Sequence, residues 1–161
     1  MRKKMLILVL CLVVFVLTAV FAVASISVAQ KDVDKKSSDW GKSSLNEIHA
    51  VRSIIFKWIN AWQSRNLAGY MSYYSPEFRS GTLDYHGWQV KKTKLFKRPG
   101  VIFLEISNLL IFIEGKEAKV SFLQDYTDAY LADVGEKNMK LIKLNDSWKI
   151  ISEEWKPISG N

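Results

Sequence analysis

Apolar and polar residues alternate along the last third of the chain, in a pattern that predicts consecutive β-strands. Between Lys116 and Tyr130 every second residue belongs to one face, and this period of two is typical of a strand with one buried side. The residues of that face are Ala118, Val120, Phe122, Gln124, Tyr126, Asp128 and Tyr130. Two further strands are expected at Glu136–Leu144 and Ser147–Trp155, after turns at Asp133–Gly135 and Asn145-Asp146. The stretch therefore predicts an antiparallel meander.

In the first part of the domain, apolar residues recur every three or four positions, as they do in amphipathic helices. Apolar residues recur at these intervals over Leu45–Trp62, and Ser44 with Glu47 has the spacing of a capping box. We therefore expect one long helix beginning at Ser44. Two shorter helices are predicted, one at Leu67–Tyr74, which Asn66 can cap, and one at Gly87–Arg98. Each is expected to end where a proline follows, at Pro76 and Pro99.

The region between the helices and the meander predicts two more strands. Phe78–Tyr85 is expected to form a short strand, and Val101–Ile113 a long one that is buried on both faces along part of its length and turns at Glu114-Gly115. Helices followed by strands indicate an α+β fold, in which a long N-terminal helix and two shorter helices pack on one face of a curved, mainly antiparallel sheet.

The N-terminal segment predicts export. Arg2, Lys3 and Lys4 precede an uncharged, largely apolar run, residues 5–24. Small residues at Ser27 and Ala29 favour a signal peptide, residues 1–29, cleaved before position 30. The alternative is a retained membrane anchor, because residues 5–24 are long enough to span a bilayer. We expect a polar linker at 30–43, a domain at 44–157 and a tail at 158–161, in the periplasm or cell envelope, either soluble or anchored.

Composition narrows the classes of function. The formal charge of +7 falls to +4 without Arg2, Lys3 and Lys4, a mild excess that does not suggest nucleic acid as a partner. Cys11 is the only cysteine and lies in the export segment, so the domain is expected to have neither a disulfide nor a thiol ligand. The sequence has no phosphate loop, metal-ligand spacing or nucleophile elbow, so no metal and no cofactor is predicted.

Short motifs along residues 44–157 resemble the nuclear transport factor 2-like (NTF2-like) superfamily, which includes SnoaL-like and ketosteroid isomerase-like proteins. The motifs are Trp58-x-x-x-Trp62, Tyr70-x-x-x-Tyr74-Ser75-Pro76-x-Phe78, Gln124-Asp125-Tyr126, Val134-Gly135-x-Lys137 and Trp148-Lys149-Ile150-x-x-x-Glu154-Trp155. More narrowly, they resemble the domain appended to bacterial L,D-transpeptidase-like and cell-shape L,D-carboxypeptidase proteins. The resemblance implies a cone, a bent sheet around a long helix. It does not imply one activity, since the superfamily contains isomerases, dehydratases, cyclases and proteins without catalysis.

Two groups of residues are candidates for a functional site. Asp84 and His86 are an acid and an imidazole near the expected opening of the cone, and with Tyr126 they are the candidate catalytic residues. The alternative is a structural role, with Asp84 as a turn cap and His86 packed beside Trp88. The candidate ligand-binding residues, expected to line the pocket or its rim, are Tyr74, Gln124, Tyr126, Asp128, Tyr130 and Trp155. The basic run Lys91–Arg98 is interpreted as a solvated helix face.

Three hypotheses of function follow from the sequence. The first is an exported, non-catalytic envelope module whose cone binds a small ligand or a protein partner, with a link to peptidoglycan remodelling that rests on the resemblance alone. The second is a small lyase or isomerase that uses acid–base residues in the cone. The third is a domain that associates with itself as a homodimer.

Overall fold

A computed structural model describes residues 30–31, 35 and 42–158 of the chain. Its contacts divide the chain into two units, Met1–Ser44 and Leu45–Asn161, and the second unit contains the fold. Among the described residues, no helix is both long enough and apolar enough to cross a membrane. The predicted signal or anchor at residues 1–29 and most of the predicted linker lie outside the described part of the chain.

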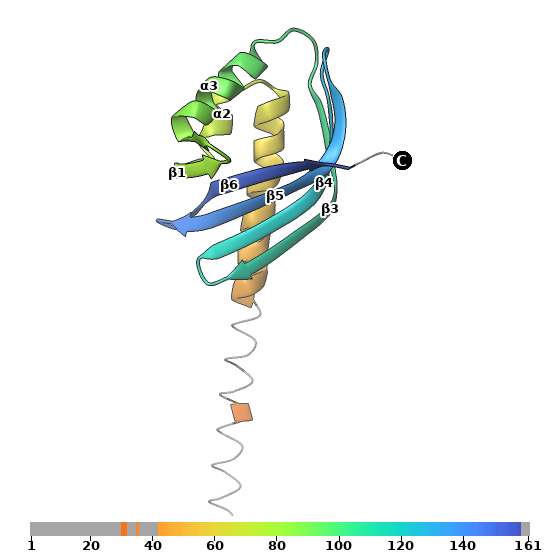
Figure 1. Cartoon of the computed structure of the whole chain (residues 1–161). Coiled ribbons are helices and arrows are strands. Elements are labelled where there is room, and N and C mark those ends of the chain that lie inside the picture. The colour runs from red at the N-terminus through yellow and green to blue at the C-terminus, as the bar shows by residue number, and fades with distance from the viewer. Residues whose placement is uncertain (1–29, 32–34, 36–41, 159–161) are drawn as a thin grey trace, which may run out of the picture. The chain divides into compact units, whose positions relative to one another are not determined.

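The long N-terminal helix is confirmed and ends at residue 63, but its described part begins at residue 42, so Ser44 lies inside the helix and does not cap it. Glu47 instead contacts the sheet: its carboxylate accepts hydrogen bonds from Lys143 Nζ at 2.6 Å and Trp148 Nε1 at 2.8 Å. The helix lies along one face of the sheet (Figure 1). Its buried residues are Val51, Ile55, Trp58, Ile59, Ala61 and Trp62.

The two shorter helices are confirmed with different ends. Helix α2 covers Leu67–Met71 and is capped by the side chain of Asn66, which accepts a hydrogen bond from the Gly69 amide at 2.9 Å. Helix α3 covers Tyr85–Phe96 and begins two residues earlier than predicted, because Asp84 caps it. Arg65, just past the N-terminal helix, donates hydrogen bonds to the carbonyl oxygen of Phe96 at the end of α3, at 2.9 Å, and to that of Gly100 in the following loop, at 2.5 Å.

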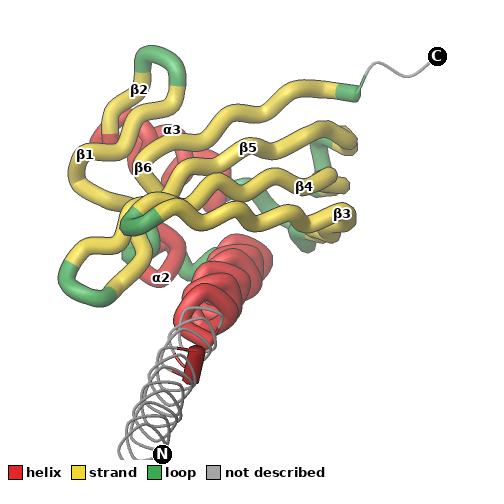
Figure 2. The backbone as a smooth tube through the Cα atoms, turned by 90° about the horizontal axis from the view of Figure 1, so that it is seen from below, coloured by secondary structure: helices red, strands yellow, loops and turns green. Residues whose placement is uncertain are grey.

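Within residues 42–158 the strands form one six-stranded sheet in the order β2-β1-β6-β5-β4-β3 (Figure 2). The strands are β1 (Tyr74–Ser80), β2 (Leu83–Asp84), β3 (Phe103–Glu114), β4 (Glu117–Thr127), β5 (Ala132–Leu144) and β6 (Ser147–Pro157). All neighbouring pairs are antiparallel except β1 and β6, which are parallel. The architecture is therefore the predicted α+β fold with a mainly antiparallel sheet.

The turn between β4 and β5 is not where the sequence pattern placed it. Residues 133–135 lie inside β5, and the chain turns at 128–131, where the Asp128 carboxylate accepts hydrogen bonds from the amides of Tyr130 and Leu131. Gly135 is needed for packing, because the Cβ atom of any other residue there would lie only 2.5 Å from Trp155 Cε2 and would clash with the ring. The turn predicted at Asn145-Asp146 is confirmed, with φ of 45° and 62° at the two residues.

Strand β3 also differs from the prediction, since only one of its faces is buried. It is an edge strand of the described sheet, and its outward residues Phe103, Leu110 and Phe112 are 48%, 68% and 61% exposed. The pattern of β-branched and aromatic residues suggested two buried faces, but no second layer covers the outer face within the described residues. The alternating face of β4 is confirmed, because Ala118, Val120, Phe122, Gln124 and Tyr126 are all buried.

Candidate functional site: a charged cluster inside an aromatic cone

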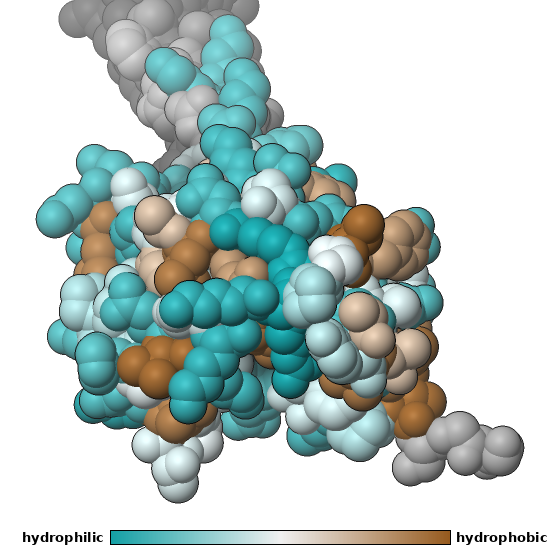
Figure 3. All heavy atoms as spheres, turned by 90° about the horizontal axis from the view of Figure 1, so that it is seen from above, coloured by the Kyte–Doolittle hydropathy of each residue, from teal (hydrophilic) through white to brown (hydrophobic). Residues whose placement is uncertain are grey.

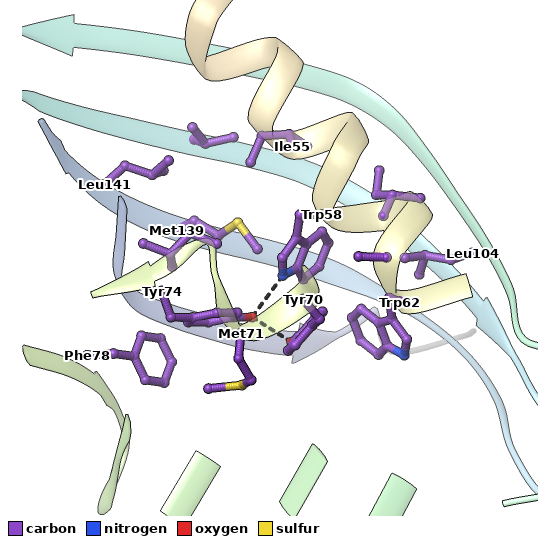
Figure 4. Packing of buried hydrophobic residues seen from close by; sticks show 14 of the residues in the cluster. Ile55, Trp58, Trp62, Tyr70, Met71, Tyr74, Phe78, Leu104, Met139 and Leu141 are labelled. Atoms are coloured by element: carbon purple, nitrogen blue, oxygen red, sulfur yellow. Dashed lines mark hydrogen bonds between the residues drawn. The ribbon is translucent and has the colours of Figure 1, made fainter. Parts of the chain in front are cut away.

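Large aromatic side chains fill the space between the sheet and the helices. Trp58 contacts Trp62 with ring centroids 5.1 Å apart and Phe122 at 6.4 Å, which joins the N-terminal helix to β4. The rings continue through Tyr70 of α2 and through β1 (Figure 4), and Trp88 and Phe96 of α3 belong to the same core. The aromatic residues of this core, none more than 8% exposed, are Trp58, Trp62, Tyr70, Tyr74, Phe78, Trp88, Phe96, Phe122, Tyr126 and Trp148.

A chain of hydrogen bonds runs through these rings. Trp58 Nε1 donates to the Tyr74 hydroxyl at 2.8 Å, and the Tyr74 hydroxyl donates to the Tyr70 hydroxyl at 2.5 Å (Figure 4). The Tyr74 hydroxyl is also 3.3 Å from Glu153 Oε1. Burial, followed by the charge of Glu153, raises the pKa of both tyrosines. The two hydroxyls therefore stay protonated and act as fixed hydrogen-bonding groups in the core.

Glu153 and Lys137 form a buried ion pair on the inner face of the sheet. Glu153 is 1% exposed and Lys137 is 4% exposed, and Lys137 Nζ lies 3.5 Å from Glu153 Oε2. The contact is an ion pair without a hydrogen bond, and Oε2 has no hydrogen-bond partner among the described residues. An ion pair this deeply buried is expensive to desolvate, so it needs further support from its surroundings.

Lys92 lies beside this ion pair in a box of aromatic rings. Its ammonium is 3.6 Å from the ring centroid of Trp62, 4.7 Å from Trp88 and 5.2 Å from Tyr70, and the residue is 4% exposed. Burial lowers the pKa of Lys92 to about 7, against the opposing effect of Glu153. Aromatic faces stabilise the charged form. The charge of Glu153 thus acts on two buried lysines, of which Lys137 is the one within ion-pair distance.

The titration of Lys92 should make the stability of the fold depend on pH. Because the unfolded chain holds this proton up to about pH 10.5 and the folded chain releases it near pH 7, unfolding between those values takes up a proton. Stability should therefore rise with pH, by up to about 1.4 kcal/mol per pH unit. Urea unfolding of the native chain and Lys92→Met at pH 7.5, 8.5 and 9.5 would measure this slope.

The matched control for this experiment is Lys94→Met, which removes an exposed lysine from the same helix. The slope should be retained in Lys94→Met and lost in Lys92→Met. An equal slope in all three proteins would show that Lys92 keeps its proton in the folded state.

The predicted pocket residues on β4 lie at one end of this cluster. Gln124 is 3% exposed and its Oε1 has no hydrogen-bond partner among the described residues. The Tyr126 hydroxyl donates to Asp128 Oδ2 at 2.7 Å, and Arg98 forms an ion pair with the same oxygen at 3.3 Å. The hydrogen bond from Tyr126, with those from the turn amides, lowers the pKa of Asp128 against the effect of burial. Tyr126 and Asp128 thus hold the turn after β4 against the loop after α3.

The remaining predicted site residues are dispersed. Tyr74 is in the cluster, whereas Tyr130 is 65% exposed and lies under the Arg98 guanidinium at 5.6 Å. Trp155 is half-buried beside Gly135. Asp84 is exposed, accepts a hydrogen bond from the Gly87 amide at 2.8 Å and has a lowered pKa because of it, which is the capping role given above as the alternative. His86 is exposed on the first turn of α3.

The charged residues of the cluster were not among the sequence-based candidates. Lys92 was assigned to a solvated helix face, and the structure corrects this, because Trp88, Lys92 and Phe96 share one buried side of α3 at spacings of four. That spacing is visible in the sequence. Glu153 and Glu154 are adjacent in β6 and point to opposite faces of the sheet, and a register shift in β6 determines which one faces inward.

Comparison with known proteins agrees with the cone architecture. The family model described as the Cds6 C-terminal NTF2-like domain matches residues 50–154. Bd1075 of Bdellovibrio bacteriovorus is 26% identical with a TM-score of 0.67, over 70% of this chain and 41% of its own. The helical cell-shape determining protein Pgp2 of Campylobacter jejuni is 21% identical with a TM-score of 0.61, over 66% of this chain and 40% of its own.

A smaller structure aligns over most of its length. The NTF2-like protein from Pseudomonas putida is 16% identical with a TM-score of 0.60, and the alignment covers 66% of this chain and 82% of that protein. The chain thus spans about two fifths of the length of Bd1075 and of Pgp2. No curated protein sequence matches it. Because the matched region is well over half of the sequence, the chain belongs to the family of the Cds6 C-terminal NTF2-like domain.

Proposed function

We propose that this chain is an exported, non-catalytic NTF2-like module of the cell envelope that binds a small ligand or a protein partner on its outside. The observation that carries the proposal is the filling of the cone, because the buried side chains of Trp62, Tyr70 and Trp88 pack around Lys92 inside it. A module of this kind uses the cone as its core. A link to peptidoglycan remodelling rests on the sequence motifs, since the likeness to Pgp2 concerns the fold.

The envelope location has a direct test. Met1–Ala29 should be absent from the mature protein, because the small residues Ser27 and Ala29 suit cleavage before Gln30. Mass spectrometry of the protein from the envelope fraction should find Gln30 as the first residue. An intact N-terminus in the membrane fraction would support the anchor at residues 5–24, and protein confined to the cytoplasm would contradict export in either form.

A second candidate function is acid–base catalysis of the lyase or isomerase type inside the cone. The observation that favours it is the juxtaposition of Lys92, whose pKa burial lowers to about 7, with Glu153 and the Tyr74 hydroxyl. A lysine with a pKa near neutrality is suited to accept a proton from a substrate. This set replaces Asp84 and His86, which are exposed at the N-terminal end of α3, as the group on which the hypothesis depends.

Ligand titrations followed by tryptophan fluorescence would separate the two candidates. A substrate in the cone must contact Trp58, Trp62 or Trp88, and its binding should be lost in Lys92→Met. A ligand on the outside should bind Lys92→Met as tightly as it binds the native chain. A compound found by thermal shift on the full chain serves as the probe in both cases.

A further inference from the structure

The outer face of the sheet carries a groove that crosses β3, β4, β5 and β6. Its volume is about 430 Å³. The register places its outward residues in two rows, each running across the four strands. One row is Phe112, Lys119, Lys140 and Ser152, and the other is Leu110, Ser121, Asn138 and Glu154. Each row therefore begins with an exposed apolar residue on β3 and continues with polar residues.

Two lysines face each other at the middle of the first row. Lys119 on β4 is directly opposite Lys140 on β5, and both are exposed. Side chains in such a pair are about 5 Å apart at Cβ, and like charges at that position destabilise a sheet. Neither ammonium forms an ion pair with a carboxylate of the described residues, although Glu117 and Glu154 lie on the same face. The arrangement leaves two adjacent positive charges without a counter-charge in contact.

The second row adds hydrogen-bonding groups and one acid. Ser121 is opposite Asn138, and Asn138 is opposite Glu154 at the β6 end. A hydroxyl and an amide can bind both the N–H and the C=O of a peptide group. Glu154 is a site for a cation, and at the β3 end the exposed side chains of Leu110 and Phe112 offer apolar contact.

We propose that this groove binds a short peptide that carries a free carboxylate, an ammonium group and an apolar side chain. The carboxylate lies between Lys119 and Lys140, the ammonium pairs with Glu154, and the apolar side chain lies on Leu110 and Phe112. Three extended residues span about 10 Å, or two strand spacings, so a tripeptide backbone covers two of the three intervals between β3 and β6 and its side chains reach across the third. An anionic lipid headgroup would satisfy the lysines but would leave Glu154 beside a second negative charge. The inference rests on the proposed binding module and names its ligand class.

The test is calorimetric titration of the full chain, in a non-ionic detergent, with the tripeptide Lys-Ala-Leu and with its C-terminal amide. The native chain should bind the free acid at least tenfold more tightly than the amide. Lys119→Met/Lys140→Met should weaken binding of the free acid at least tenfold and make the two peptides equal. Lys116→Met, which removes an exposed lysine from the adjacent β3–β4 turn, should change the affinity less than twofold.

Each alternative occupant has its own result in the same experiment. Glycerol phosphate binding more tightly than the tripeptide, with the same dependence on both lysines, would assign the groove to phosphate headgroups and overturn the proposal. Self-association of the native chain that the double variant abolishes, without any binding of the tripeptide, would assign it to a second copy. Cytoplasmic protein in the export test would contradict the envelope module without changing these affinities, so the two failures can be distinguished.

Discussion

Replacing Glu153 by Gln should lower the free energy of unfolding by about 3 to 5 kcal/mol at pH 7, although the side chain keeps its shape. The reason is that the Glu153 carboxylate interacts with two buried lysines. It forms an ion pair with Lys137 at 3.5 Å, and its negative charge opposes the effect of burial that lowers the pKa of Lys92. Without the carboxylate, Lys137 remains buried with no counter-ion. Urea unfolding monitored by tryptophan fluorescence would measure the loss.

Two control variants make this prediction specific. Glu154→Gln changes the adjacent exposed residue and should alter stability by less than about 0.5 kcal/mol. Glu153→Gln/Lys137→Met should recover much of the loss, since replacing both partners of a buried ion pair is far less costly than removing one. Lys137→Met alone should cost less than Glu153→Gln, because Lys92 still faces the carboxylate. Equal losses for Glu153→Gln and Glu154→Gln would contradict the ion pair.

The helices, the meander and the buried face of β4 could be predicted because their patterns depend on local periodicity. Ala118, Val120 and Phe122 alternate with polar residues, and the strand keeps that alternation through Gln124 and Tyr126. The turn before β5 was misplaced because Gly135 is required by a neighbour distant in sequence, the ring of Trp155. Sequence periodicity contains no information about such a contact.

The charged cluster was missed for a related reason, which the C-terminal strand illustrates. Trp148 and Ile150 face inward, and an unbroken alternation would place Glu154 inside the cone. The register shift puts Glu153 inside and Glu154 outside. A bulge inverts every later side chain of a strand, and its position depends on tertiary packing. The site could therefore not be assembled from the sequence, even though every residue in it was visible there.

Trp62→Ala should cost about 3 to 5 kcal/mol, as truncations of large buried aromatic residues do. The ring is 4% exposed and packs between helix and sheet, with centroids 5.1 Å from Trp58, 5.7 Å from Tyr70 and 5.5 Å from Tyr126. It also forms the nearest face of the Lys92 box at 3.6 Å. A urea midpoint unchanged in Trp62→Ala would show that the helix does not pack by this face.

Substitution by phenylalanine separates the packing of these rings from their hydrogen bonds. Trp62 Nε1 has no hydrogen-bond partner among the described residues, whereas Trp58 Nε1 donates to the Tyr74 hydroxyl at 2.8 Å. Trp62→Phe keeps an aromatic face over Lys92 and loses no hydrogen bond, so it should cost less than Trp58→Phe, which leaves Tyr74 without its donor in the core. The difference should be about 1 kcal/mol, the net contribution of one buried hydrogen bond. A greater loss of stability in Trp62→Phe than in Trp58→Phe would contradict this. It would show that the contact between the Lys92 ammonium and the indole ring of Trp62 stabilises the fold more than the hydrogen bond from Trp58 to Tyr74 does.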